Sequence, residues 1–150
     1  MLEIKALATS PEFFEDVFNS IYSEWGKNNP EYWRSWIRSS MNTNCIPSTY
    51  VVLKDGVYIG TFSLWLCDLQ SRQDLTPWVG GIVVDKNFRG QGVGLYIQEQ
   101  AAILLKKLGI KQAYLFTELK GFYEKTGWRF IENAYDENNK IVRIYSKKVI

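Results

Sequence analysis

Hydrophobic residues follow a helical period in the first third of the chain. Between residues 13 and 25 they recur every three or four positions, and Gly26 ends the run. Two helix-start signals, each a capping side chain followed by proline, stand at Ser10-Pro11 and at Asn29-Pro30. The pattern therefore predicts two consecutive helices, the second of them rich in tryptophan.

From residue 49 the period changes to the alternation of strands. Residues 50–53 and 57–66 flank Lys54-Asp55-Gly56, and Asp-Gly between apolar runs is a strong hairpin signal. Residues 78–84 form a further apolar strand that contains Gly80-Gly81. Glycine inside a strand marks a bulge or a close approach of another backbone, so we expect an irregularity there.

The rest of the chain alternates between the two periods. Its strongest helix pattern covers residues 91–108 and ends at Gly109. The other expected elements are an opening strand at 2–7, strands at 112–117, 128–132 and 141–146, and a short helix at 119–126. The order β-α-α-β-β-β-α-β-α-β-β predicts an α/β fold around one mixed sheet. With neither repeat nor linker, residues 1–150 are expected to form a single domain.

Composition narrows the function classes. A net charge of +2 without a basic run does not favour nucleic acid, and no apolar stretch approaches the roughly 20 residues that span a membrane. Two cysteines, Cys45 and Cys67, make neither a disulfide framework nor a metal site, so we expect a cytoplasmic protein without a metal. The chain has no histidine, which excludes Ser-His-Asp and Cys-His catalysis. Proton transfer then falls to Tyr, carboxylates, Lys, Cys, backbone groups or water.

A glycine-rich turn, Arg89-Gly90-Gln91-Gly92-Val93-Gly94, joins the strand at 78–84 to the strongest helix. Glycines let a ligand approach the backbone, and a helix start offers unpaired N–H groups, so the turn suits a phosphate or pyrophosphate. Its spacing is neither the dinucleotide fingerprint G-x-G-x-x-G nor the P-loop with its Lys. The alternative is a tight strand-to-helix turn that binds nothing.

Strand, arginine, spaced glycines and helix together resemble motif A of the Gcn5-related N-acetyltransferase (GNAT) superfamily. Farther along, Phe122-Tyr123-Glu124-Lys125-Thr126-Gly127-Trp128 is similar to the family's short helix and following strand, with Trp128 in place of the usual Phe. The order of elements also matches over nearly the whole chain. The resemblance implies a GNAT fold with a splayed pair of strands and acetyl-CoA as the co-substrate.

The same resemblance implies the roles of the cofactor-binding residues. Backbone groups of Ile82, Val83 and Val84 are expected to bind the pantetheine arm. Amides of residues 89–94, that is Arg89, Gly90, Gln91, Gly92, Val93 and Gly94, are expected to bind the pyrophosphate. An N–H near Val83 would stabilise the oxyanion as the amine attacks the thioester.

The resemblance also places Tyr123 as the acid that protonates the departing thiolate. For the base, Asp68, Asp74 and Glu118 all stand near strand ends, and Asp68 is the working choice. The implied reaction is direct transfer of the acetyl group to a primary amine in a ternary complex.

The acceptor is expected to be a small molecule, because the first two helices carry acidic and aromatic residues that suit a cationic amine. The alternative is a non-catalytic acyl-CoA-binding regulatory module, in which Tyr123 would only pack. A homodimer is compatible with the sequence.

Overall fold

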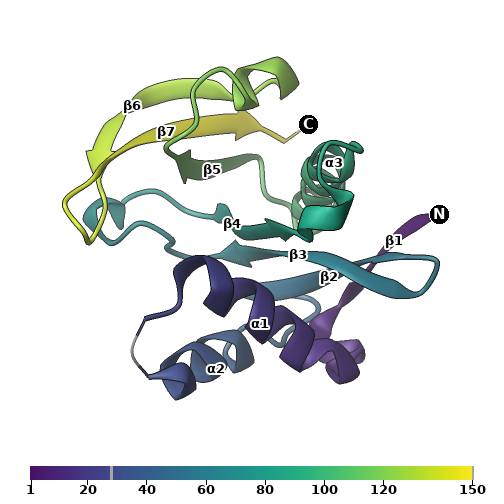
Figure 1. The fold of residues 1–150 in the computed structure, drawn as a ribbon. Coiled ribbons are helices and arrows are strands. Elements are labelled where there is room, and N and C mark those ends of the chain that lie inside the picture. Colours follow the sequence, from purple (N-terminus) through teal and green to yellow (C-terminus); the bar gives the residue numbers. More distant parts are fainter. Residues whose placement is uncertain (28, 150) are drawn as a thin grey trace.

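The computed structural model describes residues 1–27 and 29–149. Seven strands in this part of the chain form one sheet in the order β1-β2-β3-β4-β5-β7-β6 (Figure 1). The strands are β1 Leu2–Ala6, β2 Ser48–Lys54, β3 Val57–Trp65, β4 Trp78–Val84, β5 Gln112–Thr117, β6 Arg129–Tyr135 and β7 Ile141–Lys148. The helices are α1 Phe14–Trp25, α2 Pro30–Arg38 and α3 Val93–Lys107.

Helices cover the two faces of the sheet unequally. One face packs against α3 through Val93, Ile97, Ala101 and Leu105, and the other packs against α1 and α2 through a separate apolar cluster (Figure 1). The pairs β1–β2, β2–β3, β3–β4, β5–β7 and β6–β7 are antiparallel, whereas β4 and β5 are parallel. The arrangement confirms the expected mixed α/β architecture.

Two expected helix features are wrong in detail. The short helix expected at residues 119–126 is a single 3₁₀ turn, η5 Tyr123–Thr126, because Gly121 at φ +86° breaks the helical path before it. Ser10 makes no capping bond, since a 3₁₀ turn, η2 Pro11–Phe13, precedes α1. By contrast, the Asn29 side chain accepts a bond from the N–H of Glu31 and caps α2 as expected.

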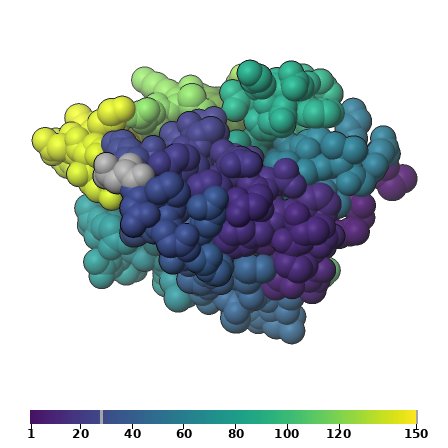
Figure 2. All heavy atoms as spheres, turned by 60° about the horizontal axis from the view of Figure 1, so that its bottom comes forward, coloured from purple at the N-terminus to yellow at the C-terminus, as the bar shows by residue number. Residues whose placement is uncertain are grey.

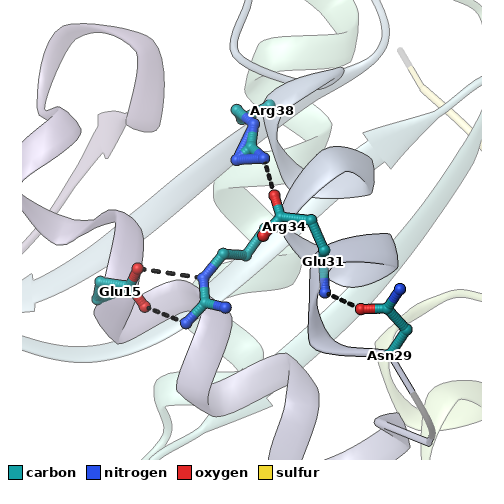
Figure 3. A network of polar contacts seen from close by, with 5 residues as sticks. All are labelled: Glu15, Asn29, Glu31, Arg34 and Arg38. Atoms are coloured by element: carbon teal, nitrogen blue, oxygen red, sulfur yellow. Dashed lines mark hydrogen bonds and ion pairs between the residues drawn. The ribbon is translucent and has the colours of Figure 1, made fainter.

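Helices α1 and α2 are held together by charged side chains (Figure 3). Arg34 of α2 donates two hydrogen bonds of 3.2 Å to the carboxylate of Glu15 on α1. Its guanidinium also lies 3.9 Å from the centre of the Phe18 ring. Within α2, Arg38 bonds Glu31. These contacts fix the helical pair as one unit over β2, β3 and β4.

The turn between β6 and β7 reaches the end of α1 on the same face of the molecule (Figure 2). Lys27 Nζ donates to Asn138 Oδ1 at 3.5 Å, although 111 positions separate the two residues. Strands β1 to β4 and strands β5 to β7 are therefore linked here by a contact between loops, in addition to the β4–β5 pair.

The η5 turn is anchored to α3 by one buried side chain. The Oε1 atom of Gln98, a residue only 5% exposed, accepts hydrogen bonds from Thr126 Oγ1 and from the indole N–H of Trp128. Because one buried side chain accepts from both donors, it fixes the end of η5 and the residue before β6 against α3.

We expect Gln98→Leu to destabilise the protein by about 1–3 kcal/mol, because it leaves the buried Trp128 N–H without an acceptor. Urea denaturation measures the loss. Gln100→Leu is the matched control, since Gln100 is a half-buried residue of the same helix whose side chain makes no hydrogen bond in the described part of the chain. Equal losses in the two variants would contradict the anchoring role.

Candidate active site

A bulge interrupts β4 at its two glycines. The register with β3 shifts between Thr61 and Ser63, and Gly81 has φ +59°. A Cβ at Gly81 would lie 3.6 Å from Ile21 of α1, and one at Gly80 would lie 3.2 Å from Trp65, which stacks on Trp36 of α2. Both glycines thus face the α1–α2 side, which consecutive residues of a regular strand cannot do.

Beyond this bulge β4 has a free edge. β4 and β5 pair only at Trp78↔Tyr114, at the first residue of β4. The rest of β4 keeps its ladder with β3, from Gly60↔Val84 to Trp65↔Trp78. The splayed strand pair that the resemblance implied is therefore present.

Alternation of the backbone decides which amides face that edge. The N–H of Asp85 donates to the carbonyl of Ile59 in β3, so the N–H of Val83 also points towards β3. The polar groups of Ile82 and Val84 consequently point the other way, to the free edge. The N–H next to Val83 that faces the free edge is therefore that of Ile82.

The turn after β4 presents a row of unpaired donors. Every backbone N–H in residues 89–94 lacks a hydrogen-bond acceptor among residues 1–27 and 29–149. Gly90 and Gly92 have φ +74° and +84°, and a Cβ at either would meet no atom within 4 Å. The turn leads into α3, whose positive end adds to the field of these amides. This arrangement fits a pyrophosphate.

The side chain of Arg89 is engaged within the protein. Its Nε donates to the Val84 carbonyl at 2.9 Å, and its Nη2 lies 3.2 Å from Glu24 Oε1 on α1. The guanidinium therefore braces the turn against β4 and α1, while the Arg89 amide stays in the row of free donors.

Tyr123 is held by its backbone and free at its hydroxyl. Its carbonyl accepts bonds from the Trp128 N–H at 3.2 Å and from Thr126 Oγ1 at 3.1 Å. Its hydroxyl has no hydrogen bond in the described part of the chain, and burial raises the pKa of this phenol. The adjacent Phe122 approaches α3 at Gly94, with 3.9 Å from its Cζ to a Cβ built there. Tyr123 thus stands near the first turn of α3 as a protonated donor.

The three carboxylates considered as bases have different surroundings. Asp74 is exposed and bonded to Arg72, which lowers the pKa of Asp74, and exposed Glu118 pairs with Lys140 at 3.6 Å. Asp68 has neither a hydrogen bond nor an ion pair with any described residue, and burial raises its pKa to about 7. Its Oδ2 lies 2.2 Å from the position of a Cβ at Gly80. Asp68 therefore reaches β4 at the bulge, and it does so only because residue 80 is glycine.

A buried chain of hydroxyls behind the bulge escaped sequence reasoning. Ser40 donates to the Ile37 carbonyl, so it accepts from Thr49, which in turn accepts from Ser63. Ser63 Oγ lies 3.4 Å from a Cβ built at Gly81. The only signal in the sequence was a set of hydroxyl residues within apolar strands, which is too common to single out these three.

The model of the family described as "Acetyltransferase (GNAT) family" matches residues 8–128 of the chain. The chain belongs to this family, and it is accordingly an acyltransferase of the class that uses acetyl-CoA. Within residues 1–27 and 29–149, no helix is long and apolar enough to cross a membrane.

Solved structures share the fold along almost the whole chain. An aminoglycoside 6'-N-acetyltransferase complexed with coenzyme A has a TM-score of 0.79 and 13% identity, over 99% of this chain and 97% of that chain. A putative phosphinothricin N-acetyltransferase has a TM-score of 0.72 and 20% identity, over 100% and 99%. The NatC complex bound to Gag peptide and coenzyme A has a TM-score of 0.73 and 15% identity, over 99% of each chain. At these identities the likeness concerns the fold alone.

We expect Gly81→Ala to weaken coenzyme A binding at least about tenfold in calorimetry, because a non-glycine residue at positive φ costs roughly 1–2 kcal/mol and relaxes the bulge. Gly56→Ala is the matched control. Gly56 also has positive φ, +81°, but it lies in the β2–β3 turn with no atom within 4 Å of an added Cβ. Both variants should lose similar stability, and only Gly81→Ala should lose affinity. Equal affinities would show that the bulge does not shape the site.

Proposed function

We propose that the protein is an N-acetyltransferase that transfers the acetyl group of acetyl-CoA directly to a primary amine of a small molecule. The observation that carries this proposal is the row of unpaired amides at residues 89–94, which is continuous with the free edge of β4. The amides would bind the pyrophosphate, and the polar groups of Ile82 and Val84 would bind the pantetheine. Val83 lies between them and pairs with β3, so it holds β4 in place.

Two side chains supply the proton transfers. Asp68 takes a proton from the acceptor ammonium, and the neutral nitrogen attacks the thioester carbon, forming the C–N bond. The N–H of Ile82 stabilises the oxyanion. When the C–S bond breaks, the thiolate takes the proton of Tyr123, and the phenolate recovers one from the nitrogen of the new amide. Asp68 then releases its proton to water, so the net reaction yields the N-acetyl product, coenzyme A and one proton.

The environment of each group suits its role. Burial raises the pKa of Tyr123, so the phenol is fully protonated at neutral pH and able to donate. Burial also raises the pKa of Asp68 to about 7, which makes its carboxylate a stronger base than an exposed aspartate. No charged neighbour contributes to that shift. At neutral pH the phenol can therefore act as the acid and the carboxylate as the base, a difference that comes from the two kinds of side chain.

The small-molecule acceptor rests on the acidic and aromatic residues of the first two helices, which suit a cationic amine. The structural neighbours include enzymes named for aminoglycosides and phosphinothricin as well as a complex with a peptide. Cytoplasmic location and homodimer formation stay predictions from the sequence.

We expect Tyr123→Phe to lower amine-dependent release of thiol from acetyl-CoA by roughly 10²-fold or more, because a general acid typically contributes that much. Coenzyme A affinity should not change. Tyr96→Phe is the control, since the Tyr96 hydroxyl donates to the Leu2 carbonyl of β1, which lies at the opposite edge of the sheet from β6. Release that persists in Tyr123→Phe would remove the acid role. Acetyl-CoA binding without release for any amine would favour the acyl-CoA-binding module.

We expect kcat/KM to rise with pH up to about 7, because the base acts only when it is ionised. Asp68→Asn should lower kcat/KM by roughly 10²-fold or more and abolish this limb of the profile. Asp74→Asn, at a carboxylate already bonded to Arg72, should keep both rate and profile. A limb near pH 7 that survives in Asp68→Asn would assign deprotonation to another group or to water.

A further inference from the structure

The ring of Tyr123, the proposed acid, is surrounded by three other aromatic rings. Its centre lies 4.9 Å from that of Phe122, 6.4 Å from that of Trp128 and 6.2 Å from that of Tyr145. Tyr145 of β7 is completely buried, whereas Phe122 is 46% exposed. Ring contacts of this kind accept several geometries, so they do not fix a side chain by themselves. The position of Tyr123 therefore also depends on what holds the backbone of η5.

The start of that turn is held by the side chain of Glu124. Gly121 has φ +86°, and its N–H donates to Glu124 Oε1 at 3.0 Å. A hydrogen bond to an ionised carboxylate is roughly twice as strong as one between neutral groups. Because this bond closes across residues 122 and 123, it fixes the backbone from which the Tyr123 ring projects.

A buried phenol on β7 holds the other oxygen of the same carboxylate. The Tyr145 hydroxyl donates to Glu124 Oε2 at 3.0 Å. It accepts from Arg143 Nε at 2.8 Å, so its single proton is left for Glu124. The Nη2 atom of Arg143 lies 3.8 Å from the same Oε2. Both oxygens of Glu124 are therefore engaged, one with the turn and the other with the sheet.

The sheet end of this network is rigid. Strand β7 is paired on both sides, with β5 and with β6. Arg143 and Tyr145 are two positions apart on β7, so their side chains lie on one face of the sheet. The Arg143 guanidinium lies 3.9 Å from the centre of the Phe130 ring. Because arginine can only donate, the hydrogen bonds run in one direction, from Arg143 through Tyr145 to Glu124.

We propose that Tyr145 is a positioning residue for the acetyl transfer: through Glu124, its hydroxyl fixes η5 so that Tyr123 presents its own hydroxyl to the departing sulfur. This inference rests on the proposed function, in which Tyr123 is the acid. Tyr145 takes no part in the proton transfers, because it is buried and its proton is bonded to Glu124. A displacement of about 1 Å near a reacting group can lower a rate about 10²-fold, so loosening η5 lowers kcat without removing a catalytic group.

Tyr145→Phe removes the hydroxyl and keeps the ring. The assay is thiol release from acetyl-CoA, with whichever of spermidine, an aminoglycoside and an amino acid supports the fastest release. We expect kcat to fall at least about tenfold, while KM for acetyl-CoA changes less than about twofold. Tyr58→Phe is the matched control and should keep kcat. The Tyr58 hydroxyl is hydrogen-bonded to Ser20 Oγ at 2.8 Å, and its ring packs with the α1–α2 cluster on the other face of the sheet.

Glu124→Ala tests the same network from the side of the turn. It should lower kcat at least as far as Tyr145→Phe does, because it also leaves the Gly121 N–H without its acceptor. Lys125→Ala is the control within η5 and should keep kcat. Lys125 is an exposed residue whose side chain makes no hydrogen bond or ion pair in the described part of the chain.

The double variant of Tyr145→Phe with Tyr123→Phe separates positioning from a general loss of structure. If Tyr145 acts through Tyr123, its loss should change kcat less than about twofold once the Tyr123 hydroxyl is gone. A general loss of structure would lower kcat by the same factor whether or not Tyr123 is intact.

The outcomes distinguish this inference from the proposed function. The same factor in both backgrounds, or an unchanged kcat in Tyr145→Phe and Glu124→Ala, overturns the inference and leaves acetyl transfer with Tyr123 as the acid. Wild-type release in Tyr123→Phe overturns the acid role and the inference but leaves the transfer standing. No release with any of the amines overturns both the proposed function and the inference.

Discussion

The left-handed backbone at Gly81, together with the absence of a side chain at Gly80, is the constraint on which the rest of the site depends. The bulge turns both glycines to the α1–α2 side and reverses the alternation of the amides that follow. As a result Ile82 and Val84 face the free edge of β4. The same bulge makes room for Asp68. One irregularity in a strand therefore prepares both sides of the site, the thioester side and the amine side.

The elements around the bulge are fixed by contacts that leave the chemically useful groups unpaired. Gln98 ties η5 to α3, while the hydroxyl of Tyr123 has no partner in the described residues. Arg89 braces the glycine turn through its side chain, while the amides of that turn stay free. In Arg89 and Tyr123, one group of the residue is hydrogen-bonded within the protein, while another group of the same residue stays free. The site is therefore held rigidly and still has unpaired donors for a ligand.

Sequence reasoning found the parts of the site that local pattern determines. The glycine turn, the strand before it and the helix after it follow from spacing alone, and β4 and β5 were predicted with their observed bounds. It could not separate Asp68 from Asp74 and Glu118, because burial and pairing depend on contacts between distant segments. The stacking of Trp65 on Trp36 could not be predicted either, because it also joins segments that are distant in the sequence. The prediction of a helix before β6 was wrong, because the helical pattern there is weak and Gly121 takes a left-handed conformation.

The burial of Asp68 also links the acceptor to folding. Its pKa is raised above that of an unfolded aspartate, so the folded protein holds this proton more tightly than the unfolded chain does. The resulting stabilisation is complete below about pH 4 and is lost as the pH rises through about 7. The ionised carboxylate that would accept the amine's proton is therefore the form that weakens the fold. An ammonium ion bound at Asp68 would restore the lost stability, so the substrate would act as the counter-ion of this buried carboxylate.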